Sequence, residues 1–344
     1  MTAKPSTPRA WTSVRRVRCR EPVTLLTGDA TQTLRALPAG TVDCVVTSPP
    51  YWRLRDYATG SWTGGNPDCT HPATATTERV GNRSCGRCGA RWSDAQIGRE
   101  ATLIEYINHL RQVFAELHRV LVPAGTVWLN LGDSYAANSD GYPNSRPGQY
   151  RQPAHRPRAD LPDKNLLGMP WKTAFALQAD GWLLRNAVIW HKTNAAPFPV
   201  RDRLANRHET VFLLAKQQHH YLDPTPREPG NTETGPLGQT ERGEDPGDVW
   251  SIPVTPRRRQ HHPAISPLQI PLRCVHLGCP RGGLVCDPFS GTGTTGLAAM
   301  RLGRAYLGID LNPSFTQLAA SRLTGISAVR PLPSGQAPAP RTER

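Results

Sequence analysis

The sequence contains no apolar run that approaches bilayer length, and no hydrophobic segment follows the arginines near its start. We therefore expect a soluble, cytoplasmic chain rather than a membrane or secreted protein. Acidic residues are scarce as well: 27 Asp and Glu stand against 41 Lys and Arg, which gives a formal net charge of +14. Such a charge favours polyanions, so DNA or RNA is the expected partner. On charge alone, an arginine-rich composition that reflects a GC-rich genome stays open as an alternative.

Disulfide bonds are not expected, because the eight cysteines occur in a long chain without a secretion signal. Four ligand-type residues stand in two close pairs within a polar stretch: Cys69 with His71, and Cys85 with Cys88. This pattern predicts a tetrahedral structural zinc site, which would supply folding energy that a stretch so poor in apolar residues lacks. Free thiols in a loop, with His71 exposed, are the alternative.

The 344 residues suit one elaborated α/β domain or two smaller domains. The basic residues 1–20 and the proline-rich residues 327–344 hold too little apolar surface to fold, so both tails are expected to be disordered. Residues 21–326 would form the folded domain. Three polar insertions rich in glycine and proline interrupt it, at residues 56–98, 134–165 and 217–262.

Strand-like runs alternate with amphipathic helical segments along the folded part, which predicts an α/β fold with a parallel, helix-covered sheet. The expected strands cover residues 23–26, 42–47, 126–131, 187–191, 210–215, 284–287 and 305–310. The expected helices cover residues 103–121, 170–179 and 294–302.

Residues 285–295 read as a buried strand, a tight glycine turn and the start of a helix. Glycines there let backbone N–H groups approach a ligand, and a helix N-terminus favours a carboxylate. The lysine of a phosphate-binding loop is absent, so nucleotide triphosphate hydrolysis is not expected. Asp310 ends the next strand, 23 residues after Asp287. This is close to the spacing of about 20 residues at which a carboxylate accepts ribose hydroxyls in dinucleotide-type folds. Together the two features indicate an adenosine-containing ligand, although the glycine turn alone would equally suit helix packing.

Residues 47–52, which read Thr-Ser-Pro-Pro-Tyr-Trp, follow an apolar strand. The two prolines fix the backbone and leave carbonyl acceptors in a rigid frame. The Ser48 hydroxyl adds an acceptor, and Tyr51 or Trp52 adds a flat face for stacking. Such a segment suits an exocyclic amine on a planar ring; taken alone, it could also be only a turn.

These segments resemble those of the S-adenosylmethionine-dependent DNA amino-methyltransferases. Residues 47–52 are similar to the catalytic motif, residues 287–295 to the cofactor loop, and their order resembles the permuted beta group. Further similar stretches lie at residues 25–30, 127–135, 188–194 and 262–264, so the resemblance covers roughly residues 22–326 outside the insertions. It implies a Rossmann-like, doubly wound, mostly parallel sheet with circularly permuted motif order. Of the three insertions, residues 56–98 would hold the zinc site, residues 134–165 would form a basic loop and residues 217–262 would be the target-recognition region.

The resemblance also implies roles for the matched positions. Ser48 and the Pro49 carbonyl, supported by Pro50, would bind the target amine, and Tyr51 would stack on the base flipped out of the duplex. Residues that would hold the cofactor S-adenosylmethionine, with Asp29 accepting from its adenine amino group, are Asp29, Asp287, Pro288, Phe289, Ser290, Gly291, Thr292, Gly293, Thr294 and Asp310. Acceptors on the amine help its nitrogen attack in line, so positioning and electrostatics would suffice without a protein nucleophile.

Serine at position 48 is the family pattern seen most often with cytosine N4 as the acceptor, whereas a carboxylate or amide is commoner for adenine N6. The resemblance therefore implies a site-specific DNA methyltransferase that favours cytosine N4, with adenine N6 as the nearest alternative. Methylation of RNA or of a protein amide, and a non-catalytic zinc-containing DNA-binding protein, are more distant alternatives. A homodimer and a separately acting restriction endonuclease are further partners that this family admits.

Two basic clusters are expected to contact double-stranded DNA, one in each of the later insertions. The first cluster interleaves cations with aromatic residues and comprises Arg146, Arg151, Arg156 and Arg158 with Tyr142, Tyr150 and His155. The second, in the expected target-recognition region, comprises Arg257, Arg258 and Arg259 with His261 and His262. A solvated basic loop is the alternative for each, because phosphate contacts and base contacts use the same residue types.

Overall fold

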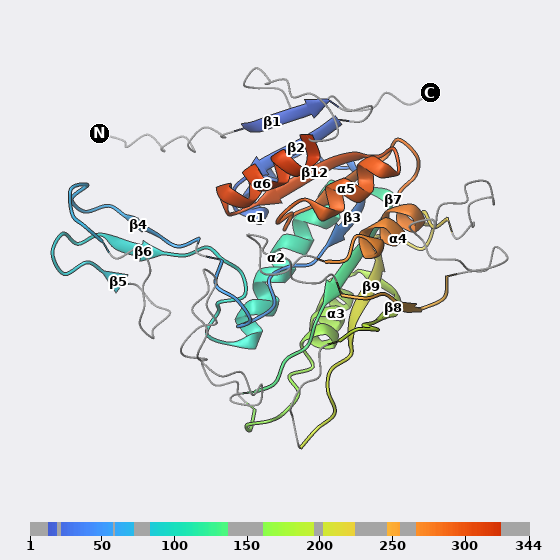
Figure 1. The fold of residues 1–344 in the computed structure, drawn as a ribbon, viewed down its shortest axis with the longest axis horizontal. Coiled ribbons are helices and arrows are strands. Elements are labelled where there is room, and N and C mark those ends of the chain that lie inside the picture. Colours follow the sequence, from blue (N-terminus) through green and yellow to red (C-terminus); the bar gives the residue numbers. More distant parts are fainter. Residues whose placement is uncertain are drawn as a thin grey trace.

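A nine-stranded sheet forms the centre of the molecule (Figure 1). The computed structural model describes residues 13–18, 22–57, 59–71, 83–136, 161–195, 202–223, 246–254 and 266–324. From one edge of the sheet to the other, the strands are β1 (Ser13–Arg18), β2 (Pro22–Thr27), β12 (Ala305–Asp310), β11 (Leu284–Asp287), β3 (Val42–Thr47), β7 (Leu121–Leu131), β9 (His208–Ala215), β8 (Leu183–His191) and β10 (Val249–Ser251). All seven expected strands are present, some of them longer than predicted.

The sheet is mostly parallel but mixed. Strands β2, β12, β11, β3 and β7 run parallel to one another. Strand β9 lies antiparallel between β7 and β8, which agrees with the prediction of a mostly, not wholly, parallel sheet. Because β8 and β9 follow each other without a helix between them in the described chain, they pair as antiparallel neighbours, which need no helical crossover.

Strand β1 pairs antiparallel with β2 and falls inside residues 1–20, for which the sequence predicts no ordered structure. Backbone hydrogen bonds to a sheet edge form whatever the side chains are, so a segment poor in apolar residues can still be ordered there. Composition alone did not indicate this pairing.

Helices cover both faces of the sheet. One face carries α1 (Ala30–Arg35), α2 (Leu103–Val120) and α3 (Met169–Ala179), and the other carries α4 (Gln269–Gly278), α5 (Thr294–Arg301) and α6 (Pro313–Thr324). Side chains of β3 alternate between the two cores: Cys44 and Val46 pack with α4 to α6, whereas Val45 packs with α1 to α3. The predicted helices are α2, α3 and α5, while α1, α4 and α6 were not predicted.

Helix α2 begins at a capping box in which Thr102 and Glu105 exchange hydrogen bonds, a signal that satisfies two backbone N–H groups at the helix start. Among the helices of the described ranges, none is both long and apolar enough to cross a bilayer.

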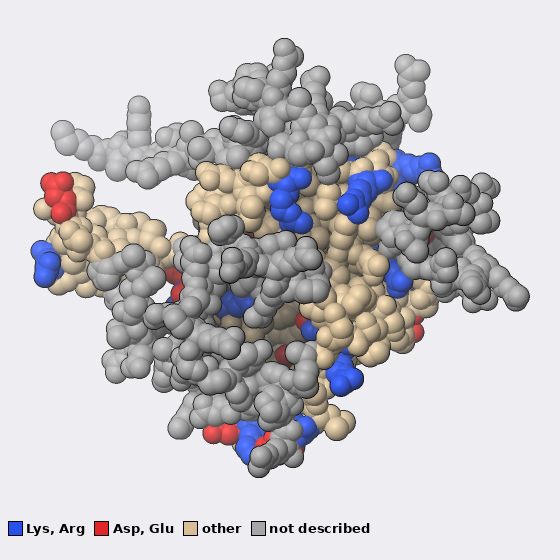
Figure 2. Space-filling model, in the orientation of Figure 1, with Lys and Arg blue, Asp and Glu red and all other residues tan. Residues whose placement is uncertain are grey.

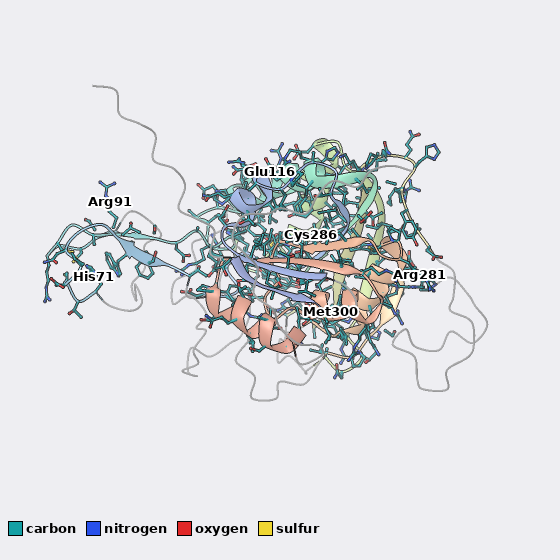
Figure 3. All side chains as sticks on the ribbon, turned by 90° about the horizontal axis from the view of Figure 1, so that it is seen from above. His71, Arg91, Glu116, Arg281, Cys286 and Met300 are labelled. Carbon is teal, nitrogen blue, oxygen red and sulfur yellow. The ribbon has the colours of Figure 1, made fainter. Side chains whose placement is uncertain are left out.

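A small antiparallel sheet projects from the body beside α2 (Figure 1). It consists of β4 (Ser61–Thr63), β6 (Arg91–Ser93) and β5 (Arg83–Ser84), in that order. We call residues 59–71 and 83–95 the arm; it lies within the first predicted insertion. Figure 3 shows the labelled His71 and Arg91 on this arm, away from the main sheet that holds Cys286.

Candidate active site

The candidate site lies at the edge of the sheet where parallel strands end. Strands β3 and β11 are parallel neighbours, with Cys44 opposite Val285, so Ser48 and Pro288 leave the sheet at the same edge. Strand β12 brings Asp310 to that edge, and β2 is followed by Asp29. A cavity of about 420 Å³ opens there, within the range of small-molecule sites.

The cavity brings together almost every catalytic and cofactor-binding residue predicted from the sequence. Its lining includes Asp29, Ser48, Pro49, Pro50, Tyr51, Asp287, Pro288, Phe289, Ser290, Gly291, Thr292, Thr294 and Asp310. We call the end lined by Asp29, Asp310 and Phe315 the acidic end, and the end lined by Ser48, Tyr51 and Glu209 the tyrosine end.

Two predicted residues are placed differently. Gly293 is not among the cavity residues: its φ of 75° turns the chain into α5, and a Cβ there would lie 3.1 Å from the Cβ of Ala319. Trp52 is only 1% exposed and donates its indole N–H to the Glu100 carbonyl, so it belongs to the core and offers no stacking face. Tyr51 is therefore the aromatic residue of this segment that borders the cavity.

Asp287 ties the two central strands together beneath the cavity. Its carboxylate accepts hydrogen bonds from the Thr47 hydroxyl at 2.8 Å, the Thr295 hydroxyl at 2.8 Å and the Phe289 N–H at 3.1 Å. Burial raises the pKa of Asp287 to about 6, because a charged carboxylate loses hydration there. These bonds fix the end of β3, and hence Ser48, relative to the glycine loop.

Asp310 braces the glycine loop from the neighbouring strand. Its carboxylate accepts from the Gly291 N–H at 2.7 Å and from the Asn312 N–H at 2.8 Å, and burial raises its pKa to about 6. Asp29 caps α1 by accepting from the Gln32 N–H at 2.9 Å, which leaves this carboxylate at the cavity wall. The acidic end thus offers two acceptors on adjacent strand tips.

Two further loop residues hold the loop itself. The Ser290 hydroxyl is buried against the Tyr306 hydroxyl at 2.8 Å, and the Thr292 carbonyl accepts from Arg322 at 2.6 Å. These contacts fix the conformation of the glycine loop.

The tyrosine end contains a polar cluster that surrounds the Tyr51 hydroxyl. Tyr51 donates to Glu209 at 2.6 Å, and Asn130 donates to the Tyr51 oxygen at 3.2 Å and to Glu209 at 3.0 Å. Lys192 donates to the other Glu209 oxygen at 2.6 Å, and the Ser48 hydroxyl lies 3.4 Å from the Tyr51 hydroxyl. Burial, together with the Glu209 charge, raises the pKa of Tyr51 well above its usual value, so the hydroxyl keeps its proton and donates it to Glu209.

Sequence reasoning gave no role to Asn130, Lys192 or Glu209. Asn130 and Lys192 lie in stretches that resemble the family, but the resemblance assigned no function to either residue. Nothing in the sequence marked Glu209, since its approach to Tyr51 depends on how β9 joins the sheet.

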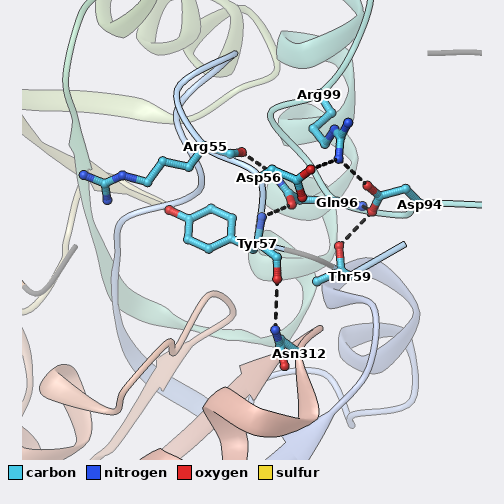
Figure 4. Close-up of polar contacts among 8 residues, drawn as sticks. All are labelled: Arg55, Asp56, Tyr57, Thr59, Asp94, Gln96, Arg99 and Asn312. Atoms are coloured by element: carbon cyan, nitrogen blue, oxygen red, sulfur yellow. Dashed lines mark hydrogen bonds and ion pairs between the residues drawn. The ribbon is translucent and has the colours of Figure 1, made fainter. Parts of the chain in front are cut away.

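The root of the arm forms part of the cavity wall (Figure 4). The two chain segments that lead into the arm are joined by Gln96, which accepts from the Tyr57 N–H at 2.7 Å and donates to the Arg55 carbonyl at 2.8 Å. Asn312, two residues after Asp310, donates to the Tyr57 carbonyl at 3.0 Å. The arm is therefore attached to the acidic end of the cavity.

A second set of contacts, beside the hydrogen bonds of Gln96, joins the same two chain segments. Arg99 bridges Asp56 at 2.6 Å and Asp94 at 3.1 Å, and Asp94 also accepts from the Thr59 hydroxyl at 2.7 Å. The contacts of Gln96 and those of Arg99 both join the segment entering the arm to the segment leaving it. Together they hold the root of the arm as one unit.

The four predicted metal ligands meet at one place on the arm. The ligand atoms of Cys69, His71, Cys85 and Cys88 all lie within 4.8 Å of one another. A tetrahedral ion with Zn–S bonds of about 2.3 Å holds its sulfurs about 3.8 Å apart, and the Cys69 and Cys85 sulfurs are 3.9 Å apart. A Cβ on Gly65 would lie 2.7 Å from the Cys88 sulfur, so only glycine fits beside this cluster. The donor set and its spacing suit zinc.

The two basic clusters expected to contact DNA, around Arg151 and Arg258, lie outside the described residues. On the face shown in Figure 2, the lysines and arginines that are coloured lie scattered over the body, and the arm's visible surface is mostly uncharged.

The sequence matches a family described as DNA methylase over residues 42–321. It is 38% identical over 309 residues to a type II methyltransferase of Xanthomonas campestris pv. cyanopsidis, with 88% of each chain covered. It is 36% identical over 308 residues to a type II methyltransferase of Citrobacter freundii, again with 88% of each chain covered. These matches extend over most of both chains and are not confined to the motifs.

Solved structures with a similar fold carry related descriptions. The PvuII DNA methyltransferase, described as cytosine-N4-specific, aligns with a TM-score of 0.56 at 16% identity, covering 88% of this chain and 90% of that one. A putative DNA modification methylase from Thermus thermophilus, solved with S-adenosyl-L-methionine, aligns with a TM-score of 0.50 at 23% identity, covering 88% and 95%. At these identities the likeness shows a shared fold.

Proposed function

The chain belongs to the DNA methylase family and is an S-adenosylmethionine-dependent DNA methyltransferase, and we propose that its acceptor is the N4 amine of a cytosine flipped out of the duplex. The observation that carries the proposal is that Ser48 and the glycine loop border one cavity. The Thr47–Asp287 hydrogen bond fixes their separation, as methyl transfer between two bound groups requires. The chain order, with Ser48 before the loop, suits the permuted beta group.

At the acidic end, Asp29 and Asp310 would hold the adenosine part of S-adenosylmethionine, beside Phe289 and the turn at Gly291. When bound, this cofactor supplies the activated methyl group. At the tyrosine end, the Ser48 hydroxyl and the Pro49 carbonyl would accept hydrogen bonds from the target amine, and Tyr51 would stack on the base. The Pro50 carbonyl instead accepts from the Tyr106 hydroxyl at 3.0 Å, so Pro50 supports the frame.

The preference for cytosine rests on Ser48. A hydroxyl in that position is the family pattern seen most often with cytosine N4, whereas a carboxylate or amide is commoner with adenine N6. Adenine N6 is the alternative acceptor in the same cavity.

Nucleoside mass spectrometry tests the acceptor. DNA methylated in vitro by the purified chain should contain N4-methylcytosine and no added N6-methyladenine, and Ser48→Ala protein provides the inactive comparison. N6-methyladenine without methylcytosine would show that the preference is wrong. Methylated RNA or protein without methylated DNA would overturn the substrate class.

The type II relatives support one further part of the proposal: a restriction endonuclease acting separately on the same recognition sequence would be the functional partner. The insertions at residues 134–165 and 217–262 would contact the double-stranded DNA through the basic clusters of their sequence. A homodimer remains a prediction that sedimentation of the purified chain would test.

We further propose that Cys69, His71, Cys85 and Cys88 bind one structural zinc ion that stabilises the arm. The arm has few buried apolar side chains among its described residues, and metal ligation would replace that missing core. Elemental analysis should find about one zinc per folded chain and a loss of zinc in Cys85→Ser/Cys88→Ser. Arg87→Ala, an exposed change between the two cysteines, serves as the control. A folded, metal-free wild-type preparation that cannot be loaded with zinc would contradict the site.

A further inference from the structure

The hydroxyl of Tyr51 is not free to turn. Side chains from three separate segments meet at it: Asn130 from β7, Glu209 from β9 and, through Glu209, Lys192 just after β8. Strands β7, β9 and β8 are neighbours in the sheet, so the cluster is built on paired backbone rather than on a loose loop.

Glu209 is the centre of this cluster. One of its oxygens accepts from Tyr51 at 2.6 Å and from Asn130 at 3.0 Å, and the other accepts from Lys192 at 2.6 Å. Its side chain is 15% exposed and that of Lys192 is 20% exposed, so the pair is mostly shielded from water. An ion pair held by additional hydrogen bonds in such a place fixes geometry more than it adds stability.

The ring of Tyr51 is confined as well. A Cβ at position 132 would lie 2.7 Å from the Cε2 atom of Tyr51, so the ring packs closely against the backbone of Gly132. Tyr51 also borders the cavity next to Ser48. With the backbone of Gly132 beside the ring and Glu209 holding its hydroxyl, the ring can present only one orientation to the cavity.

We propose that Glu209, held by Lys192 and Asn130, is a positioning residue that fixes the Tyr51 ring as the surface on which the extruded base stacks. The inference rests on the proposed function, since it assigns how that same site orients its substrate. A ring that could turn about its side-chain bonds would leave the target amine in many positions relative to Ser48, and misplacement by about 1 Å can lower a rate about 100-fold.

The test is a double-mutant cycle on single-turnover methylation of duplex DNA, with Glu209→Ala, Tyr51→Phe and their combination. Tyr51→Phe keeps the ring but removes the hydroxyl that Glu209 holds. Each single variant should lose about 10- to 100-fold in rate, and the double variant should lose no more than the worse single one. Cofactor affinity, measured by calorimetry, should change less than about twofold, because the cluster lies at the other end of the cavity.

Three comparisons separate positioning from a purely structural role. Glu209→Gln keeps an oxygen that can accept from Tyr51 but puts an amide nitrogen, which cannot accept, beside Lys192, so it should recover only part of the rate. Glu116→Ala removes an ion-paired glutamate on α2, away from the cavity, and should leave the rate unchanged. A fluorescent base analogue at the target position should show incomplete stacking in Glu209→Ala. If Glu209→Ala does not fold, the single-turnover methylation rate of Tyr51→Phe alone tests the positioning role.

An unchanged rate in Tyr51→Phe, or additive losses in the cycle, would overturn the positioning role. A Glu209→Ala protein with lower thermal stability but the wild-type rate would show that the pair is only structural. These outcomes are distinct from failure of the proposed function, in which the wild-type chain itself would methylate no DNA.

Discussion

The two ends of the cavity hold their carboxylates in opposite ways. Within the described residues, Asp310 at the acidic end and Asp287 beneath the cavity accept hydrogen bonds from neutral hydroxyl and backbone N–H groups. The tyrosine end instead pairs Glu209 with the Lys192 ammonium. A carboxylate bonded only to neutral donors can still accept from the hydroxyl and amino groups of the adenosine proposed for that end, whereas the ion-paired Glu209 is already engaged in holding Tyr51. The comparison teaches that one end is suited to accept hydrogen bonds from a ligand and the other to fix a side chain.

The largest expected effect is at the tyrosine end. Ser48→Ala should lower the single-turnover methylation rate by about 100-fold or more, because it removes the hydroxyl proposed to accept from the reacting amine. Affinity for S-adenosylmethionine, measured by calorimetry, should stay nearly the same, since the acidic end is untouched. Equal losses of methylation rate and of cofactor affinity in Ser48→Ala would contradict the assignment of amine binding and cofactor binding to separate ends of the cavity.

A smaller effect is expected at the acidic end. Asp310→Ala removes the acceptor proposed for the ribose hydroxyls and also the hydrogen bond that braces Gly291, so cofactor affinity should fall about 10- to 100-fold. At saturating cofactor the methylation rate should recover in large part. Asp202→Ala, which breaks an exposed ion pair with Lys164, is the matched carboxylate control. Unchanged cofactor affinity in Asp310→Ala would remove this residue from the binding site.

The pH dependence sharpens the comparison further. Burial raises the pKa of Asp310 to about 6 from its usual 3.8, so below that pH the carboxyl is protonated and accepts hydrogen bonds poorly. Cofactor affinity should therefore fall as the pH drops through about 6, by less than tenfold per pH unit. This trend should be reduced in Asp310→Asn.

Stability of the cofactor-free chain should follow the opposite sign. A folded-state pKa above the unfolded value means that the folded chain binds more protons, so the contribution of Asp310 to the free energy of unfolding is full below about pH 4 and is lost as the pH rises through about 6. Asp287 should act in the same direction, because burial raises its pKa to about 6 as well. Thermal unfolding of wild type and Asp310→Asn across this range checks the sign, and stability that rises with pH only in wild type would contradict it.

The smallest effect concerns the arm. Gly65→Ala places a Cβ within 2.7 Å of the Cys88 sulfur at a φ of 74°, so it should weaken zinc retention against a chelator by about tenfold or less. Gly86→Ala, where a Cβ meets nothing within 4 Å, is the control. Since the cavity lies at the arm's root, the methylation rate should change little. Equal zinc retention in both variants would show that the ligand cluster tolerates crowding.

The sequence predicted the residues whose position depends on local chain geometry. Ser48 follows β3 directly and Gly291 follows β11, so recognising two parallel strands was enough to place both at one edge. The four proposed metal ligands were likewise marked by their spacing, although the meeting of Cys69 with Cys85 depends on how the arm folds.

The residues that sequence reasoning missed depend on distant strand pairing. Glu209 reaches Tyr51 only because β9 enters the sheet antiparallel beside β7, and a strand pattern does not encode its direction or register. Trp52 and Tyr51 are adjacent aromatics, and only the packing of the chain buries one and leaves the other at the cavity.

Transfer of an isotopically labelled methyl group from S-adenosylmethionine to duplex DNA in a single turnover tests most directly that the two motifs form one site. The label should appear on cytosine N4 at up to one methyl per active chain, and Ser48→Ala should bind the cofactor but transfer almost nothing. Tight binding of cofactor and DNA by the wild-type chain, with no label in the DNA, would contradict the account.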